Sequence, residues 1–299
     1  MPLKCGPFAF RTNNKFRPSL AQCGDGSGDF KRRTDVSTSF VAGVDIGSVA
    51  TKVALFGGGK VLGRAVVPTG VSPQAAAEAA LTAALAEAGL TTRPARVAST
   101  GYGRRATQSP GDIVTEITAA ARGAHWLGTP SGPARTVVDI GGQDTKVILV
   151  HTDGLVADFA MNDKCAAGTG RFLSLMAHAL EVELGELGDL SLRATQPVTI
   201  NATCAVFAES EVVSLIARGR RKEDIVAGIH AAIASRIANM VRQMGGKDIV
   251  FTGGGAKNKG LHKALETALG GPIHVPPDPQ FVVSTGAALI AADKHGAGG

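Results

Sequence analysis

The chain has 299 residues, of which 44% are hydrophobic and 19% charged, a balance typical of a globular enzyme large enough for two packed lobes. Only 4% are aromatic, which argues against a stacking platform for single-stranded nucleic acid. Much of the net charge of +6 comes from the first forty residues, where seven Lys and Arg stand against three Asp. With no bilayer-spanning apolar run and no secretory signal, we expect a cytoplasmic protein that binds neither membrane nor nucleic acid.

Residues 1–39 are rich in Gly, Ser, Asn and basic residues and show no periodicity. A segment of this composition buries too little apolar surface to fold, so it predicts a disordered N-terminal extension. A start-site artefact and a short partner-binding tail are the alternatives.

The next segment predicts strands at 40–44, 51–56 and 60–67, the last two joined by a turn of three glycines, Gly57 to Gly59. An Ala-rich helix follows over 73–89, and then a strand at 97–100.

One pattern occurs twice. Asp45 to Leu55 reads DIGSVATKVAL, and Asp139 to Leu149, 94 residues later, reads DIGGQDTKVIL. Each copy follows an apolar strand and continues into a strand, a glycine turn and another strand. A duplication of this size predicts an α/β fold of two similarly built lobes, which we place at 40–130 and 131–299.

The rest of the second lobe is mostly helical. Its periodicity predicts helices at 168–184, 206–218 and 222–244, a strand at 248–252, and a closing helix at 285–293.

The repeated hairpins predict a phosphate site. Glycines let backbone N–H groups approach a phosphate, and a carboxylate at a strand end, here Asp45 or Asp139, holds Mg²⁺. One Asp before Gly is usually a turn residue, whereas two matched copies indicate a grip on a triphosphate. The sequence contains no Walker P-loop.

This arrangement resembles the actin, hexokinase and Hsp70 superfamily, whose lobes have a ribonuclease H-like, actin-like fold. The resemblance implies that ATP and Mg²⁺ are held by two hairpins and a late glycine turn. It implies catalytic roles for Asp45 and Asp139, of which Asp139 is favoured to orient the attacking water with help from Gln143. The residues implied to flank the phosphates are Gly47, Ser48, Lys52, Gly141 and Gly142, and those implied to flank adenosine are Gly253, Gly254 and Gly255.

The four cysteines form no C-x-x-C pair, which argues against a zinc ribbon. Cys165 and Cys204 each stand just before a predicted helix, where free N–H groups stabilise a thiolate or an anionic metal–thiolate cluster. Two cysteines cannot supply four ligands, but two copies on a twofold axis can. Two buried structural thiols are the alternative, and so is a site completed by Cys5 and Cys23.

The segments MNDKCAAGTGRFL at 161–173 and CAVFAESE at 204–211 resemble the activators of 2-hydroxyglutaryl-CoA dehydratase. These belong to the BadF/BadG/BcrA/BcrD ATPase family, which includes ATP-binding subunits of benzoyl-CoA reductase. The likeness runs from about Gly43 to Ala292 and implies that Cys165 and Cys204 bind one [4Fe–4S] cluster shared by a homodimer. Ala120 replaces a histidine common in the family.

The resemblance implies an ATPase that takes an electron from a ferredoxin or flavodoxin and passes it at low potential to a 2-hydroxyacyl-CoA dehydratase. The nearest alternative is an ATP-hydrolysing subunit of a benzoyl-CoA reductase. A sugar or acyl kinase, which needs no cluster, and a non-catalytic chaperone or scaffold are alternatives of other classes.

Overall fold

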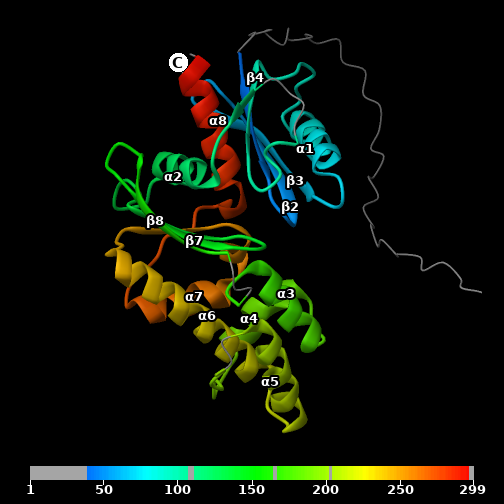
Figure 1. Ribbon diagram of the computed structural model, residues 1–299, viewed down its shortest axis with the longest axis vertical. Coiled ribbons are helices and arrows are strands. Elements are labelled where there is room, and N and C mark those ends of the chain that lie inside the picture. Colours follow the sequence, from blue (N-terminus) through cyan, green and yellow to red (C-terminus); the bar gives the residue numbers. More distant parts are fainter. Residues whose placement is uncertain (1–38, 107–110, 164–166, 202–203, 296–299) are drawn as a thin grey trace, which may run out of the picture. The chain divides into compact units, whose positions relative to one another are not determined.

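The computed structural model describes residues 39–106, 111–163, 167–201 and 204–295 (Figure 1). The predicted extension 1–39 therefore lies outside the described residues except for Ser39, and so do Cys5, Cys23 and Cys165. Within the described ranges, no helix combines the length and the apolar character needed to cross a membrane.

The first sheet has five strands among the described residues, in the order β3-β2-β1-β4-β5. β1, β2 and β3 are antiparallel neighbours, whereas β4 and β5 run parallel to β1. The four strands predicted from the sequence are confirmed, with bounds β1 Val41–Ile46, β2 Ala50–Gly57, β3 Lys60–Pro68 and β4 Arg96–Thr100. The short strand β5, Gly111–Ile113, was not predicted. Helix α1, Pro73–Glu87, packs against β2 and β3, and Ser72 caps its N-terminus with a hydroxyl that accepts from the N–H of Ala75.

The second sheet repeats this plan, with the described strands in the order β8-β7-β6-β9. Its bounds are β6 Thr136–Ile140, β7 Thr145–Val150, β8 Val156–Asn162 and β9 Ile249–Thr252. The cross-strand pair Asp45 and Lys52 in the first sheet has its counterpart in Asp139 and Lys146. The two-lobed fold predicted from the duplication is confirmed.

The structural repeat extends further than the sequence pattern. Gly101 after β4 and Gly253 after β9 both have positive φ, +91° and +82°. A Cβ on Gly101 would lie 2.5 Å from the carbonyl oxygen of Ile46, and one on Gly253 2.4 Å from that of Ile140. Both positions therefore require glycine, because the parallel strand turns tightly over the end of the hairpin strand.

Helices α2, Glu116–Leu127, and α8, Val282–His295, pack against each other, and α8 also packs on β1, β2 and β4 (Figure 1). The approach is close: a Cβ on Gly286 would lie 1.8 Å from the carbonyl oxygen of Ala119, and one on Gly43 would lie 1.9 Å from that of Ser284. The C-terminal helix thus lies on the first sheet, although it follows the second sheet in the chain.

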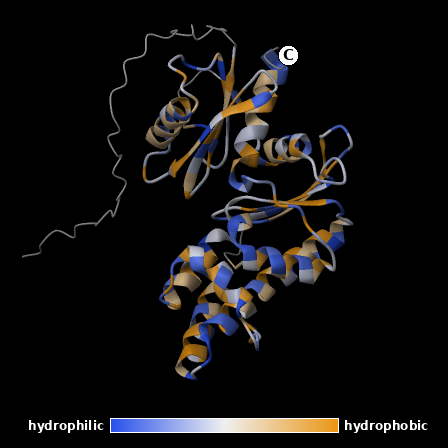
Figure 2. Cartoon of the chain, turned by 180° about the vertical axis from the view of Figure 1, so that it is seen from behind, coloured by the Kyte–Doolittle hydropathy of each residue, from blue (hydrophilic) through white to orange (hydrophobic). Residues whose placement is uncertain are grey.

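The remaining helices lie with the second sheet, and Figure 2 shows them with both hydrophobic and hydrophilic positions. The helix predicted at 168–184 is shorter than expected: α3 ends at Ala179, and Glu181 takes a left-handed conformation with φ of +53°. Helices α4 and α7 were not predicted. The bounds are α3 Gly170–Ala179, α4 Leu187–Leu192, α5 Ala205–Ala217, α6 Lys222–Met244 and α7 Lys259–Leu269.

Candidate nucleotide site

One cavity of about 430 Å³ gathers the nucleotide-site residues predicted from the sequence. Its volume lies within the usual range of ligand pockets. Both hairpins and the turn after β9 contribute to its wall, through Asp45, Gly47, Ser48, Lys52, Asp139, Gly141, Gly142, Gln143, Gly253, Gly254 and Gly255. The structure thereby brings these side chains and glycines together, while the role of each stays a prediction.

In the first hairpin, the lysine pairs with an aspartate of the same hairpin. Lys52 Nζ lies 2.9 Å from Asp45 Oδ2, its cross-strand partner. Burial alone would lower the pKa of Lys52, but the carboxylates around it, Asp45 foremost, raise that pKa above its usual value. The lysine is therefore charged at neutral pH and faces a cavity suited to an anion.

In the second hairpin, the lysine also pairs with a carboxylate outside the hairpin. Lys146 Nζ lies 2.6 Å from Asp144 Oδ1, 2.8 Å from Glu116 Oε2 and 3.7 Å from Asp139 Oδ2. Its side chain is only 3% exposed. Burial would lower the pKa of Lys146, yet the three carboxylates together hold it above its usual value. The pKa of Glu116 lies above its usual value: burial is the largest cause, Asp45 and Asp144 add to it, and Lys146 acts in the opposite direction.

The sequence analysis missed Glu116, Asp144 and Lys146 as site residues. Lys146 could have been found, since it aligns with Lys52 in the repeat, and Asp144 lies within the repeated segment. Glu116 belongs to no recognised pattern, and only the tertiary fold brings the first turn of α2 to the hairpin.

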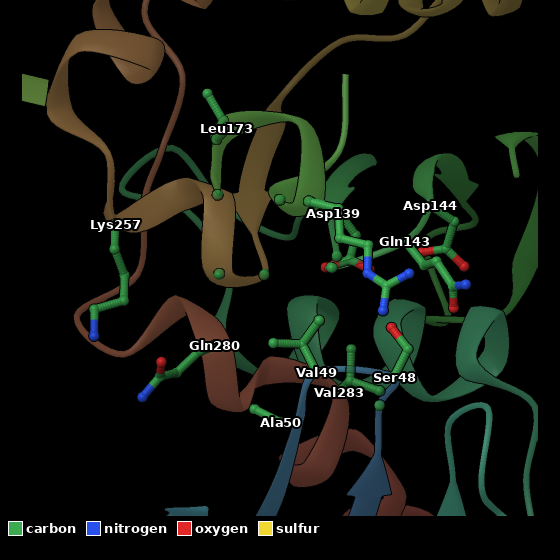
Figure 3. A pocket seen from close by; sticks show the side chains of 18 of the residues that line it. Ser48, Val49, Ala50, Asp139, Gln143, Asp144, Leu173, Lys257, Gln280 and Val283 are labelled. Carbon is green, nitrogen blue, oxygen red and sulfur yellow. The ribbon is translucent and has the colours of Figure 1, made fainter. Parts of the chain in front are cut away.

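Further lining residues come from helices and loops. Figure 3 shows Lys257 and Gln280 toward one end of the cavity and Ser48, Gln143 and Asp144 toward the other. The wall carries four carboxylates, Asp45, Glu116, Asp139 and Asp144, together with four cations, Lys52, Lys146, Arg171 and Lys257. Carboxylate oxygens beside lysines and glycine N–H groups are the donors that a Mg²⁺–polyphosphate pair requires.

Of the two predicted cluster ligands, the structure describes Cys204. Its thiol is exposed and free, and the residue stands directly before α5, as the sequence predicts. Among the described residues, no three His, Cys, Asp or Glu side chains are grouped to hold a metal. The pairing of Cys204 with Cys165 stays a prediction, because Cys165 lies outside the described residues.

Two similar sheets, each with an Asp-x-Gly hairpin, and a shared cavity define a two-lobed actin-like ATPase. The comparisons narrow the class. The chain belongs to the BadF/BadG/BcrA/BcrD ATPase family, whose model matches residues 42–291. The family resemblance seen in the sequence is thereby confirmed.

Curated relatives and solved structures agree with this family assignment. The (R)-2-hydroxyglutaryl-CoA dehydratase activating ATPase of Acidaminococcus fermentans is 41% identical over 85% of this chain and 98% of its own. The crystal structure of that dehydratase's component A superposes with a TM-score of 0.80 at 40% identity, covering 85% of this chain and 98% of that one. The Clostridium difficile activator of 2-hydroxyisocaproyl-CoA dehydratase, solved with bound ADPNP, has a TM-score of 0.79 at 38% identity, covering 85% and 95%. A benzoyl-CoA reductase subunit of Thauera aromatica is 34% identical over 86% and 94%.

Proposed function

We propose that this protein is an ATP-dependent electron-transfer activator of a 2-hydroxyacyl-CoA dehydratase. One observation carries the proposal: the cavity with two Asp–Lys hairpins lies in the same chain as an exposed thiol at the start of a helix, and the chain is 38–41% identical to two dehydratase activators.

In the nucleotide half of the reaction, the N–H group of Gly142 binds a phosphate oxygen. The N–H groups of Gly47 and Gly141 close the two hairpin turns on the carbonyls of Ala50 and Asp144, so these glycines lie beside the phosphates without donating to them. Asp45 and Asp139 are the residues that would hold Mg²⁺, which would supply a positive charge beside the phosphates, and Asp139 would orient the attacking water with Gln143. Lys52 neutralises phosphate charge, and the turn of Gly253 to Gly255 lies against adenosine. Hydrolysis changes the contacts between the hairpins, which is the differential binding needed to drive a change between two arrangements.

In the electron half, Cys204 and Cys165 of two copies hold a [4Fe–4S] cluster. The exposed thiol of Cys204 fits this role, since it stands directly before α5, where the free N–H groups of the first helical turn favour an anionic cluster nearby. When bound, the cluster supplies one low-potential electron, received from a ferredoxin or flavodoxin. The homodimer doubles each ligand, and the exposed apolar side chains Val206, Phe207 and Val213 on α5 support a partner surface beside the cysteine.

A benzoyl-CoA reductase subunit is the second candidate, supported by the 34% identity to the Thauera protein. The higher identity to dehydratase activators favours the first. Purified protein, ATP and a reductant should restore activity to a 2-hydroxyacyl-CoA dehydratase and leave a benzoyl-CoA reductase core inactive.

The experiment that tests the proposal is anaerobic purification followed by iron, sulfide and ATPase measurements. We expect about two iron atoms per chain, which is one [4Fe–4S] cluster per dimer. Cys165→Ser and Cys204→Ser should each lose the iron and still bind ATP, while the control variants Cys5→Ser and Cys23→Ser should keep both. A colourless wild type that phosphorylates a sugar would instead support the kinase alternative, and a protein without ATP turnover would support a scaffold.

A further inference from the structure

The side chain of Thr145 forms a hydrogen bond outside its own hairpin. Thr145 is the first residue of β7 and is 1% exposed, and its Oγ1 donates to the carbonyl oxygen of Gly168 at 2.8 Å. Gly168 is three residues after Cys165 in the chain. A buried hydrogen bond therefore ties the hairpin that carries Asp139 and Gln143 to the segment that follows Cys165.

Two backbone hydrogen bonds reinforce this link. The N–H of Gly170 donates to the carbonyl of Gly141 at 2.8 Å, and the N–H of Arg171 donates to the carbonyl of Gly142 at 2.9 Å. The first turn of α3 thus lies on the hairpin turn. The approach is close, because a Cβ on Gly170 would lie 3.1 Å from the oxygen of Gly141.

Peptide planarity makes this contact sensitive to what binds in the cavity. The carbonyl of Gly141 and the N–H of Gly142 belong to one planar trans peptide, so they point in opposite directions. Gly142 lines the cavity, and the carbonyl of Gly141 in the same peptide accepts from Gly170, which also lines the cavity, as does Arg171. A phosphate that turns or fixes this peptide through its N–H therefore acts on α3 through its carbonyl.

The first hairpin offers the contrast. Thr51 occupies the equivalent position of β2 and is also buried, but its hydroxyl bonds to Thr69 Oγ1 at 2.9 Å, and Thr69 donates to the carbonyl of Gly47 at 2.7 Å. Thr51 thus stabilises its own hairpin through Thr69. The same residue type has therefore diverged in function between the two copies, and Thr145 alone of this pair reaches the segment after a cysteine.

The opposite side of this segment is fixed by α6. Arg236 donates from Nη1 to the carbonyl of Ala167 at 3.0 Å. The peptide units at 167 and 168 are thus held between the long helix on one side and the phosphate hairpin on the other. A displacement of the hairpin therefore changes the hydrogen bond from Thr145 to Gly168, while the bond from Arg236 to Ala167 still holds the segment to α6.

We infer that Thr145 is a positioning residue that transmits the nucleotide state of the cavity to residues 167–171, which follow Cys165 in the chain. The inference rests on the proposed function for the importance of Cys165, but the coupling itself concerns only described residues. It predicts that nucleotide binding changes the stability of the first turn of α3, and that this change requires the Thr145 hydroxyl.

Hydrogen exchange of the full chain, followed by mass spectrometry with and without Mg²⁺–ADP, tests this. In the wild type, nucleotide should slow exchange in the first turn of α3 by about five-fold, the worth of one net hydrogen bond. In Thr145→Val, the nucleotide effect at α3 should fall below about two-fold, while the dissociation constant of ADP, from calorimetry, stays within about three-fold, because Thr145 does not line the cavity. Thr51→Val, the matched control, should keep the response at α3, and Thr145→Ser should restore it.

A wild-type response in Thr145→Val would overturn the inference, and so would an equal loss in Thr51→Val. If Thr145→Val does not fold, the pair Thr145→Ala and Thr145→Ser decides, since only the serine keeps the hydroxyl. If the wild type binds no ADP at all, the proposed function fails instead, which calorimetry separates from a failure of the coupling.

Discussion

Lys146 and Glu116 form an ion pair of 2.8 Å that ties the second hairpin to the first turn of α2. The equivalent lysine of the first hairpin, Lys52, pairs with its own cross-strand Asp45 at 2.9 Å. The duplication thus places the same residue at the same register position, but Lys146 lies closer to Glu116 and Asp144 than to its cross-strand Asp139, at 3.7 Å. Because α2 also packs on α8, this ion pair connects the second sheet to the helices of the first.

Removal of the Lys146 charge should destabilise the fold. In Lys146→Met, the carboxylates of Glu116, Asp139 and Asp144 face one another without a cation, and we expect a loss of about 3 kcal/mol in the free energy of unfolding, measured in urea. Lys259→Met is the control, because that side chain is 77% exposed and lies 3.9 Å from Asp189. It should cost less than about 0.5 kcal/mol. Equal effects of the two substitutions would contradict the buried link.

The carboxylates of the two hairpins should be needed for turnover. Asp45→Ala and Asp139→Ala each remove a group expected to organise Mg²⁺, so the ATPase rate should fall by about two orders of magnitude or more. Iron content should be unchanged, because neither residue is a proposed cluster ligand. Asp153→Ala, in the exposed turn between β7 and β8, should have wild-type turnover. Wild-type rates in both hairpin variants would exclude this cavity as the catalytic site.

The sequence predicts much of this fold because the duplicated hairpins carry local information. Each copy contains the apolar strand, the glycine turn and the cross-strand Asp–Lys pair, as Asp45 and Asp139 illustrate. The partners of Glu116 and the position of α8 could not be predicted, since both depend on contacts between segments far apart in the chain. The helix beginning near 168 ends early because Glu181 takes a left-handed conformation, which residue periodicity does not reveal.

Close packing of α8 on α2 gives a third prediction. Gly286→Ala would place a methyl group 1.8 Å from the carbonyl oxygen of Ala119. The backbone of α2 would have to move to relieve this clash. We expect a loss of about 1–3 kcal/mol from overpacking, measured by thermal or urea unfolding. Gly271→Ala is the matched control, because its added Cβ would meet nothing within 4 Å. A neutral Gly286→Ala would mean that the helices separate easily.

His230 gives a prediction of pH dependence. It lies on α6, is 1% exposed, and its Nε2 lies 3.0 Å from Nδ2 of Asn258, a residue of the cavity wall. Because Oδ1 of Asn258 already accepts from the N–H of Leu261 at 3.0 Å, the amide nitrogen donates and Nε2 of His230 accepts. Burial lowers the pKa of His230 to about 4, from 6.5 in the unfolded chain.

Between pH 6.5 and 4 the unfolded chain therefore binds a proton at His230 that the folded chain does not bind. The free energy of unfolding is unaffected by this group above pH 6.5 and falls as the pH drops through the window, by up to about 3 kcal/mol. His230→Gln should remove this contribution. The free energies of unfolding of variant and wild type, measured in urea, should therefore change with pH in parallel above pH 6.5, and only the wild type should show the extra loss below it. His151→Gln, an exposed control, should follow the wild type throughout. A His230→Gln variant with the full wild-type slope between pH 4 and 6.5 would show that other groups cause it.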